Sequence, residues 1–168
     1  MPSSEGLRKQ EHRWQLTRHT VLPCAIIAIT PMDGSERFEQ LIAFISSQLP
    51  KPVDEQQGGD GSIVFTGGEP SEVIVHLTDE TVTVAEFAGD WDEDAFSIAP
   101  RIVGELHWHA LPETALMNAL SALIKGAREA RLSKYRSCPE CGETLPPEYF
   151  GTKDRCPRCT DEPSGLVH

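Results

Sequence analysis

Four of the five cysteines in this chain lie close together near its C-terminal end. Cys138 and Cys141 form one Cys-x-x-Cys pair, and Cys156 and Cys159 form a second pair after fourteen intervening residues. Thiols in this arrangement could hold a metal ion, take part in redox chemistry or be joined as disulfides. Two pairs about 15 to 20 residues apart let two tight turns face each other around one metal ion. The spacing, at the short edge of that range, therefore favours a metal site of four thiolates.

The residues inside the two pairs favour the tight turns that such a site needs. Pro139 and Pro157 each follow the first cysteine of a pair, where a fixed φ near about −65° starts a turn. Gly142 can take a positive φ and direct backbone N–H groups towards the thiolates. The stretch CPECG resembles the knuckle of the zinc-ribbon families, and CPRC resembles its partner. This resemblance covers only residues 136–168 and implies one structural zinc ion held by the four cysteines, without implying a function.

The alternatives to zinc explain the pattern less well. Rubredoxin-like iron sites use two glycine-bearing knuckles set further apart, whereas Thr160 stands at the glycine position of the second knuckle here. A β-branched residue takes a positive φ poorly, so we expect the second turn to open differently. A thioredoxin-like redox site needs only one Cys-x-x-Cys at the start of a helix, which would leave the second pair unexplained.

Composition indicates the compartment and the size of the core. The start of the sequence, MPSSEGLRKQEHR, has no apolar signal-peptide core, so we expect a reducing, cytoplasmic location without disulfides. The longest apolar run, VLPCAIIAI, is far shorter than the roughly 20 residues of a membrane span, and no transmembrane segment is expected. With 168 residues, of which 39% are hydrophobic, the chain can bury one main core. A ribbon of about 30 residues would take its folding free energy from zinc.

Charge is distributed unevenly along this acidic chain, whose formal net charge is −11. Residues 33–113 hold 17 acidic and 3 basic residues, a net −14, whereas residues 125–168 hold 8 basic and 7 acidic residues, a net +1. An acidic domain repels nucleic acid, because backbone phosphates dominate non-specific affinity. If nucleic acid binds, we expect it at the C-terminal end.

The N-terminal half of the sequence predicts an arm, a strand and a helix. Residues 1–20 are polar, and CAIIAI at 24–29 is an apolar run typical of a strand covered on both faces, with Cys24 as a core residue. Asp33 and Glu36 form a capping pattern in front of apolar residues at helical spacing, and prolines end this helix near residue 50.

The middle of the sequence predicts strands joined by polar loops. Hairpin-length joints indicate an antiparallel meander of three strands at 62–66, 72–78 and 81–87. The polar stretch 53–62 and the acidic stretch 89–100 predict loops, and residues 101–110 alternate as a strand with one solvated face. A long helix from Pro112 to about Tyr135 follows, with an apolar stripe formed by Leu116, Leu120, Leu123, Ile124 and Ala127.

These elements predict an α+β fold in which a mainly antiparallel sheet carries two packed helices, followed by a small C-terminal zinc ribbon. We expect three parts: an N-terminal arm at 1–20, an α+β domain at 21–136 that ends in the long helix, and the four-cysteine ribbon at 137–168.

Two further constellations could carry chemistry in the main domain. Glu105, His107 and His109 project from one side of a strand and could ligate a metal if His76 or another residue contributed, although half-exposed strands commonly carry such a polar face. The carboxylates of Asp90, Asp92 and Asp94 alternate as at the opening of a calcium loop. Alanine and arginine stand where that loop needs its glycine and its final glutamate, so we predict a solvated acidic loop.

A row of cations on the long helix, Lys125, Arg128, Arg131 and Lys134, is a candidate surface for an acidic partner such as nucleic acid. The alternative is a solvated helix face whose cations offset the helix dipole. Taking these observations together, we expect a non-catalytic, cytoplasmic zinc-binding protein that acts as a protein-interaction or adaptor module. The alternatives are a nucleic-acid-associated zinc-ribbon factor and a metal-dependent enzyme centred on Glu105, His107 and His109.

Overall fold

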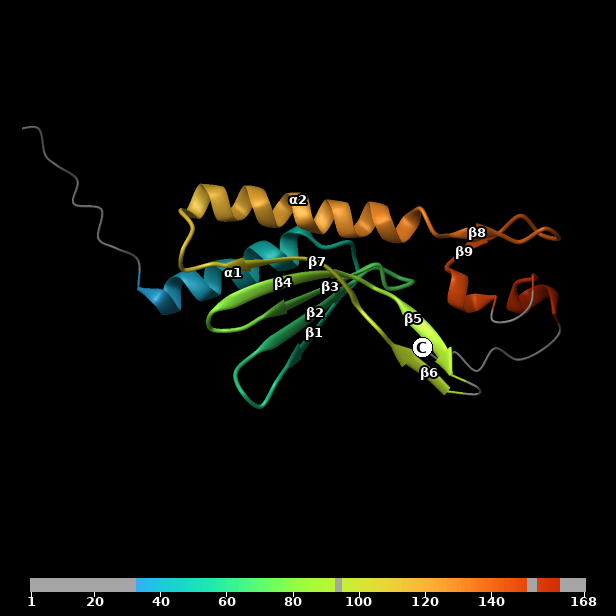
Figure 1. Cartoon of the computed structure of the whole chain (residues 1–168), viewed down its shortest axis with the longest axis horizontal. Coiled ribbons are helices and arrows are strands. Elements are labelled where there is room, and N and C mark those ends of the chain that lie inside the picture. Colours follow the sequence, from blue (N-terminus) through green and yellow to red (C-terminus); the bar gives the residue numbers. More distant parts are fainter. Residues whose placement is uncertain (1–32, 93–94, 151–153, 161–168) are drawn as a thin grey trace, which may run out of the picture. The chain divides into compact units, whose positions relative to one another are not determined.

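The structure is a computed structural model that describes residues 33–92, 95–150 and 154–160. A five-stranded sheet carries two helices, α1 (Gly34–Gln48) and α2 (Glu113–Leu132), and the cysteine-bearing segment follows α2 (Figure 1). The fold class is α+β, as the sequence predicts. The strand predicted at 24–29 lies outside the described residues.

Every neighbouring pair of strands in the sheet is antiparallel, and the strand order is β1-β2-β3-β4-β7. The strands are β1 (Val53–Gln57), β2 (Ile63–Gly67), β3 (Val73–Leu77), β4 (Thr81–Glu86) and β7 (Arg101–His107). The predicted meander is confirmed as β2, β3 and β4, because the joints between these strands are too short for a parallel crossover.

The polar stretch 53–62, which the sequence predicts as a loop, contains the edge strand β1. Val53 packs on the core, and the other residues of β1 are exposed. The loop prediction is wrong because pairing of its backbone with β2 holds β1, whereas its Asp, Glu and Gln side chains carry no strand pattern. The Gly58 N–H donates to the Ser62 carbonyl at 2.7 Å, and the Asp60 carboxylate accepts from Ser62, which together close the turn into β2.

The acidic stretch 89–100 is also not a loop, since it forms a hairpin of β5 (Gly89–Asp92) and β6 (Ala95–Ile98). The Ala99 N–H donates to the Ala88 carbonyl at 2.8 Å, so the hairpin continues the β4–β7 pairing beyond the sheet. The prediction is wrong because an existing strand pair extends into this stretch through backbone bonds, which acidic side chains do not signal.

Strand β7 carries a bulge, so the regular alternation predicted over 101–110 is wrong at this point. The register shifts opposite Val84 and Ala85 of β4 and leaves Val103 as an extra residue. Ile102, which a strict alternation would place on the same face as Leu106, is therefore 71% exposed. The strand also ends at His107, before the last residues of the predicted pattern.

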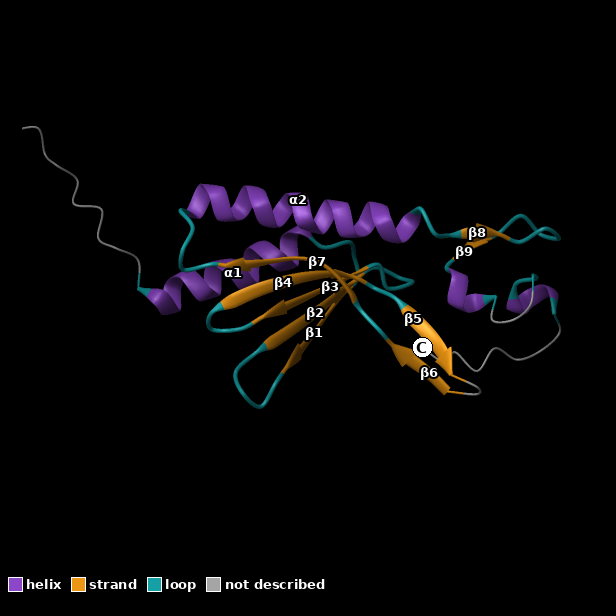
Figure 2. Cartoon of the chain, in the orientation of Figure 1, coloured by secondary structure: helices purple, strands orange, loops and turns teal. Residues whose placement is uncertain are grey.

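Both helices pack on one face of the sheet around a single apolar core (Figure 2). The predicted stripe of α2 is confirmed, because four of its residues are buried and Leu123 packs against them. In α1, Leu41 and Ile45 are fully buried, and Asp33 occupies the N-cap position without a capping hydrogen bond from its side chain. Among the described residues, no helix combines the length and apolar character that a membrane span requires.

After α2 the chain forms a small segment with its own cluster of buried residues. It consists of β8 (Arg136–Ser137), β9 (Thr144–Leu145) and two 3-10 helices, η1 (Pro147–Tyr149) and η2 (Pro157–Cys159). Strands β8 and β9 are antiparallel, and the first cysteine pair lies in the turn between them. The buried cluster consists of Cys138, Phe150 and Cys156.

Candidate metal centre

The four cysteines of the two Cys-x-x-Cys pairs come together in the C-terminal segment. Their Sγ atoms all lie within 4.8 Å of one another. The Sγ atoms of Cys141 and Cys156, which belong to different pairs, are 3.6 Å apart. Cys138 and Cys156 are buried, Cys159 is half-buried and Cys141 is exposed. The fold therefore gathers four soft ligands at one point, which is open to solvent on one side.

The first turn of the cluster is closed by the β8–β9 hairpin. The Cys138 N–H donates to the Glu143 carbonyl at 2.8 Å, and the Gly142 N–H donates to the Cys138 carbonyl at 2.9 Å. Gly142 has a φ of 73°, the conformation that its residue type predicts. A residue with a Cβ would be strained at this positive φ. The closed turn therefore requires glycine at position 142.

The second turn is built differently, as the presence of Thr160 predicts. The Cys159 N–H donates to the Cys156 carbonyl at 3.0 Å within η2. Thr160 has a φ of −96°, which a β-branched residue adopts without strain. Its hydroxyl donates to the Pro157 carbonyl at 3.2 Å. The threonine thus replaces the glycine turn with a side-chain hydrogen bond.

Hydrogen bonds give the thiols different proton affinities. The backbone N–H groups of Cys141 and Cys156 lower the pKa of the Cys138 thiol to about 6. Hydrogen bonds with the thiols of Cys156 and Cys141 raise the pKa of Cys159 to about 12. Four thiolates this close together repel one another, so the fully deprotonated cluster requires a cation at its centre.

The donor set and the distances suit a tetrahedral metal ion. Zn–S bonds of about 2.3 Å correspond to S–S separations of about 3.8 Å around a tetrahedron. The 3.6 Å between Cys141 and Cys156 is close to this value. Four sulfur ligands do not suit Mg²⁺ or Ca²⁺, which prefer oxygen. Cys138, Cys141, Cys156 and Cys159 could therefore hold a single thiophilic ion.

No family model, curated protein or solved structure matches this chain. The resemblance to a zinc ribbon therefore rests on the type, spacing and geometry of the four cysteines. Within the ranges that the structure describes, these cysteines are also the only group of three or more His, Cys, Asp or Glu side chains placed to share a metal ion.

The structure does not gather the second candidate set of ligands. The Glu105 carboxylate accepts a hydrogen bond from the Thr83 hydroxyl at 3.0 Å on the exposed face of the sheet. His107 is exposed at the end of β7. His109 lies beyond the strand, stacks on Trp108 and is 2.9 Å from the Asp79 carbonyl through Nε2. His109 therefore has local partners of its own beyond the end of β7.

The acidic candidates at 90–94 lie on a hairpin strand. Asp90 and Asp92 belong to β5, whose backbone pairs with β6, and Asp94 lies outside the described residues. An extended strand runs nearly straight, whereas the backbone of a calcium loop curls around one ion to bring its ligands together. The geometry of β5 therefore does not resemble the start of a calcium loop.

Three cations of the predicted row lie on α2, Lys134 lies two residues beyond its end, and each of the four has an acidic partner. The pairs are Lys125 with Glu129, Arg128 with Glu72, Arg131 with Glu148 and Lys134 with Glu86. Three cations of the C-terminal segment are paired as well: Arg136 with Asp154, Arg155 with Glu140 and Arg158 with Glu143. Arg131 is only 2% exposed, so it is not part of the surface in this structure. The described C-terminal cations are therefore largely neutralised within the chain.

Glu148 is a buried charged residue whose role its sequence context does not predict. It is 8% exposed in η1, and its carboxylate is the partner of the Arg131 guanidinium. The only signal for it in the sequence is its place among the prolines and aromatic residues of PPEYF, where an acidic residue is unusual. Its partner stands 17 residues earlier in the chain, on a different element.

Proposed function

We propose that this chain is a non-catalytic zinc protein in which one structural zinc ion folds the ribbon at 137–168. The observation that carries the proposal is the approach of four Sγ atoms to within 4.8 Å of one another. A site closed by four protein ligands leaves no coordination position for water or substrate, so the ion stabilises structure and does not catalyse a reaction. Free thiols of this kind persist in a reducing compartment, which supports a cytoplasmic location.

We further propose that the α+β domain at 21–136 acts as an interaction module for another protein. Residues 33–113 carry a net charge of −14. Among the ion pairs of the described residues, only Glu72 and Glu86 of this stretch have a cationic partner. Within the part of the chain that the structure describes, most carboxylates of this stretch therefore lack an ion pair, which favours a partner with a basic surface.

The nucleic-acid alternative finds less support. A phosphate-binding surface needs cations that can replace counterions along the backbone. Here the described cations of α2 and of the chain that follows it already contact carboxylates of the same chain. The enzyme alternative lacks a gathered set of catalytic or ligating side chains at Glu105, His107 and His109.

Elemental analysis of the purified full chain tests the proposal. We expect one equivalent of zinc per chain and no iron. Absence of bound metal, or one equivalent of iron in place of zinc, would overturn the structural zinc site. Two equivalents of zinc would show that a second metal site exists and would favour the enzyme.

A further inference from the structure

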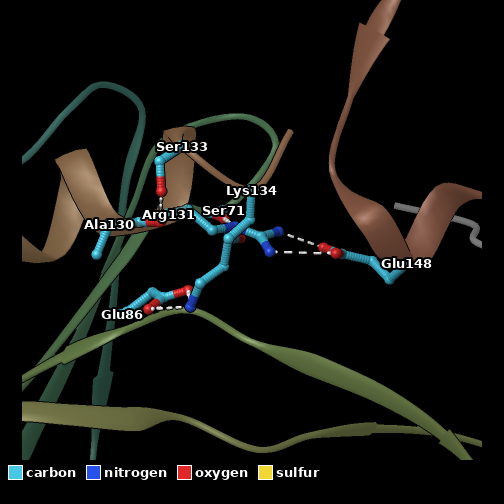
Figure 3. Close-up of polar contacts among 7 residues, drawn as sticks. All are labelled: Ser71, Glu86, Ala130, Arg131, Ser133, Lys134 and Glu148. Atoms are coloured by element: carbon cyan, nitrogen blue, oxygen red, sulfur yellow. Dashed lines mark hydrogen bonds and ion pairs between the residues drawn. The ribbon is translucent and has the colours of Figure 1, made fainter. Parts of the chain in front are cut away.

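Glu148 joins three parts of the structure at one point. Its carboxylate makes two hydrogen bonds to the guanidinium of Arg131 on α2, one of them 3.1 Å long from Nη1 to Oε2 (Figure 3). Its backbone carbonyl accepts a hydrogen bond of 3.0 Å from the indole N–H of Trp91 on β5. Because Glu148 lies between the two cysteine pairs, the ribbon meets both α2 and the β5–β6 hairpin through this residue.

The surroundings of Arg131 form a closed receptor for a carboxylate. The side chains of Arg131 and Glu148 are 3% and 5% exposed. The guanidinium lies 5.3 Å from the ring centroid of Phe87 and 5.4 Å from that of Tyr135. Its Nε donates to the Ser71 carbonyl at 3.3 Å. Burial raises the pKa of Tyr135, as expected for a contact from which water is excluded.

A short packed path connects Glu148 to the cysteine cluster. Phe150, two residues after Glu148, is 3% exposed and packs with Cys138 and Cys156. Leu145, which precedes η1, packs against the same cluster. The position of η1 therefore depends on the closure of both knuckles, because its flanking side chains sit directly on the cysteines.

We propose that zinc binding at the four cysteines and docking of Glu148 on Arg131 stabilise each other, so that loss of zinc detaches the ribbon from α2 and releases Trp91. This inference rests on the proposed zinc site. If zinc strengthens docking by some factor, linkage requires that docking strengthens zinc binding by the same factor. Removing one partner of a buried ion pair leaves an uncompensated charge, so the coupling is large.

The neighbouring pair of Lys134 and Glu86 supplies an internal reference. Lys134 Nζ lies 2.5 and 2.7 Å from the two carboxylate oxygens of Glu86, beside Arg131 (Figure 3). Both residues precede the ribbon, so this pair does not cross the docking contact. It is expected to persist when the ribbon detaches.

Zinc affinity, measured by competition with a chromogenic chelator on the full chain, tests one side of the coupling. Glu148→Gln removes the charge and nearly preserves the shape, and we expect the Kd for zinc to rise about tenfold or more. The matched control is Glu129→Gln, which changes the same charge at an exposed pair with Lys125 on α2, outside the ribbon. The control should stay within about twofold of the unmodified chain. Equal affinities of the unmodified chain and the Glu148→Gln variant would overturn the proposal.

Fluorine NMR of the chain labelled with 5-fluorotryptophan tests whether zinc controls docking of the ribbon. The measurement compares the zinc-bound and zinc-free forms of the unmodified chain. The Trp91 resonance is assigned with Trp91→Phe. We expect zinc removal to shift this resonance, whereas that of Trp108, which is 2% exposed and donates to the Thr78 carbonyl, stays in place and reports an intact domain. An unchanged Trp91 resonance on loss of a full zinc equivalent would overturn the coupling alone. A chain that never binds zinc would overturn the metal site instead.

Discussion

The guanidinium of Arg128 on α2 lies 2.5 Å from the carboxylate of Glu72, which precedes β3. The Glu72 side chain is 12% exposed and the Arg128 side chain is 49% exposed, so the pair is held at the surface of the domain. This contact directs a half-exposed cation of the predicted row towards its own chain. Because Arg128 is already paired with Glu72, it is less available to contact the phosphates of a nucleic acid.

We expect single- and double-stranded nucleic acid probes to bind negligibly near physiological salt. The acidic domain repels phosphates, and the cations of α2 are paired with acids of the chain. Fluorescence anisotropy over a salt series measures the affinity. Glu72→Gln frees Arg128 and should raise the affinity at low salt slightly, with Arg128→Gln as its control. A salt-sensitive nanomolar complex that Arg128→Glu abolishes would contradict this prediction.

Substitution of Cys141 by serine should abolish stoichiometric zinc, because the hydroxyl is a far poorer zinc ligand than the thiolate. Cys141 is exposed, so the change should affect the packing of the domain little. The matched control is Cys24→Ser, which changes the fifth cysteine and should keep one equivalent of zinc. Zinc content per chain after gel filtration is the measurement. A full equivalent in Cys141→Ser would show that the metal binds elsewhere.

Removal of zinc should melt the ribbon and leave the sheet and helices folded. The main core is built from α1, α2 and the five-stranded sheet, and it includes none of the cysteines of the ribbon. Far-UV circular dichroism with a chelator should retain most of the helical signal, and amide exchange should accelerate after α2 and at the β5–β6 hairpin, while the main core stays protected. Loss of the whole spectrum would mean that the two parts fold as a single unit.

Two glycine-to-alanine substitutions should change stability in opposite directions. A Cβ on Gly126, within α2, would meet no atom within 4 Å, so Gly126→Ala should raise the free energy of unfolding by about 1 kcal/mol through helix propensity. A Cβ on Gly104 would lie 2.7 Å from Cδ2 of Leu123, so Gly104→Ala should lower it by about 1 kcal/mol. Urea unfolding of both variants measures the changes. An unchanged or higher free energy of unfolding in Gly104→Ala would contradict the close approach of β7 to α2 at Leu123, and a lower one in Gly126→Ala would contradict the open space at that position.

The elements that the sequence could predict are those whose side chains carry a periodic pattern. The apolar stripe of α2 and the meander of β2, β3 and β4 follow from periods near 3.6 and 2. Strands β1 and β5 are held by pairing of their backbones with the next strand along the chain, and their polar side chains carry no such period. The bulge beside Val103 also escapes prediction, because it depends on the register against β4.

The four cysteines could be recognised as metal-binding candidates from the sequence alone. Each Cys-x-x-Cys turn is a local structure, and its ability to bind a metal depends on a few neighbouring residues. Tertiary structure decided the roles of the cations and of Glu148. Arg131 belongs by spacing to a surface row, yet packing turns it inward against Phe87, Tyr135 and a carboxylate 17 residues later. A charge pattern shows which cations share a helix, but only the packing of distant elements determines which of them find a partner and lose contact with water.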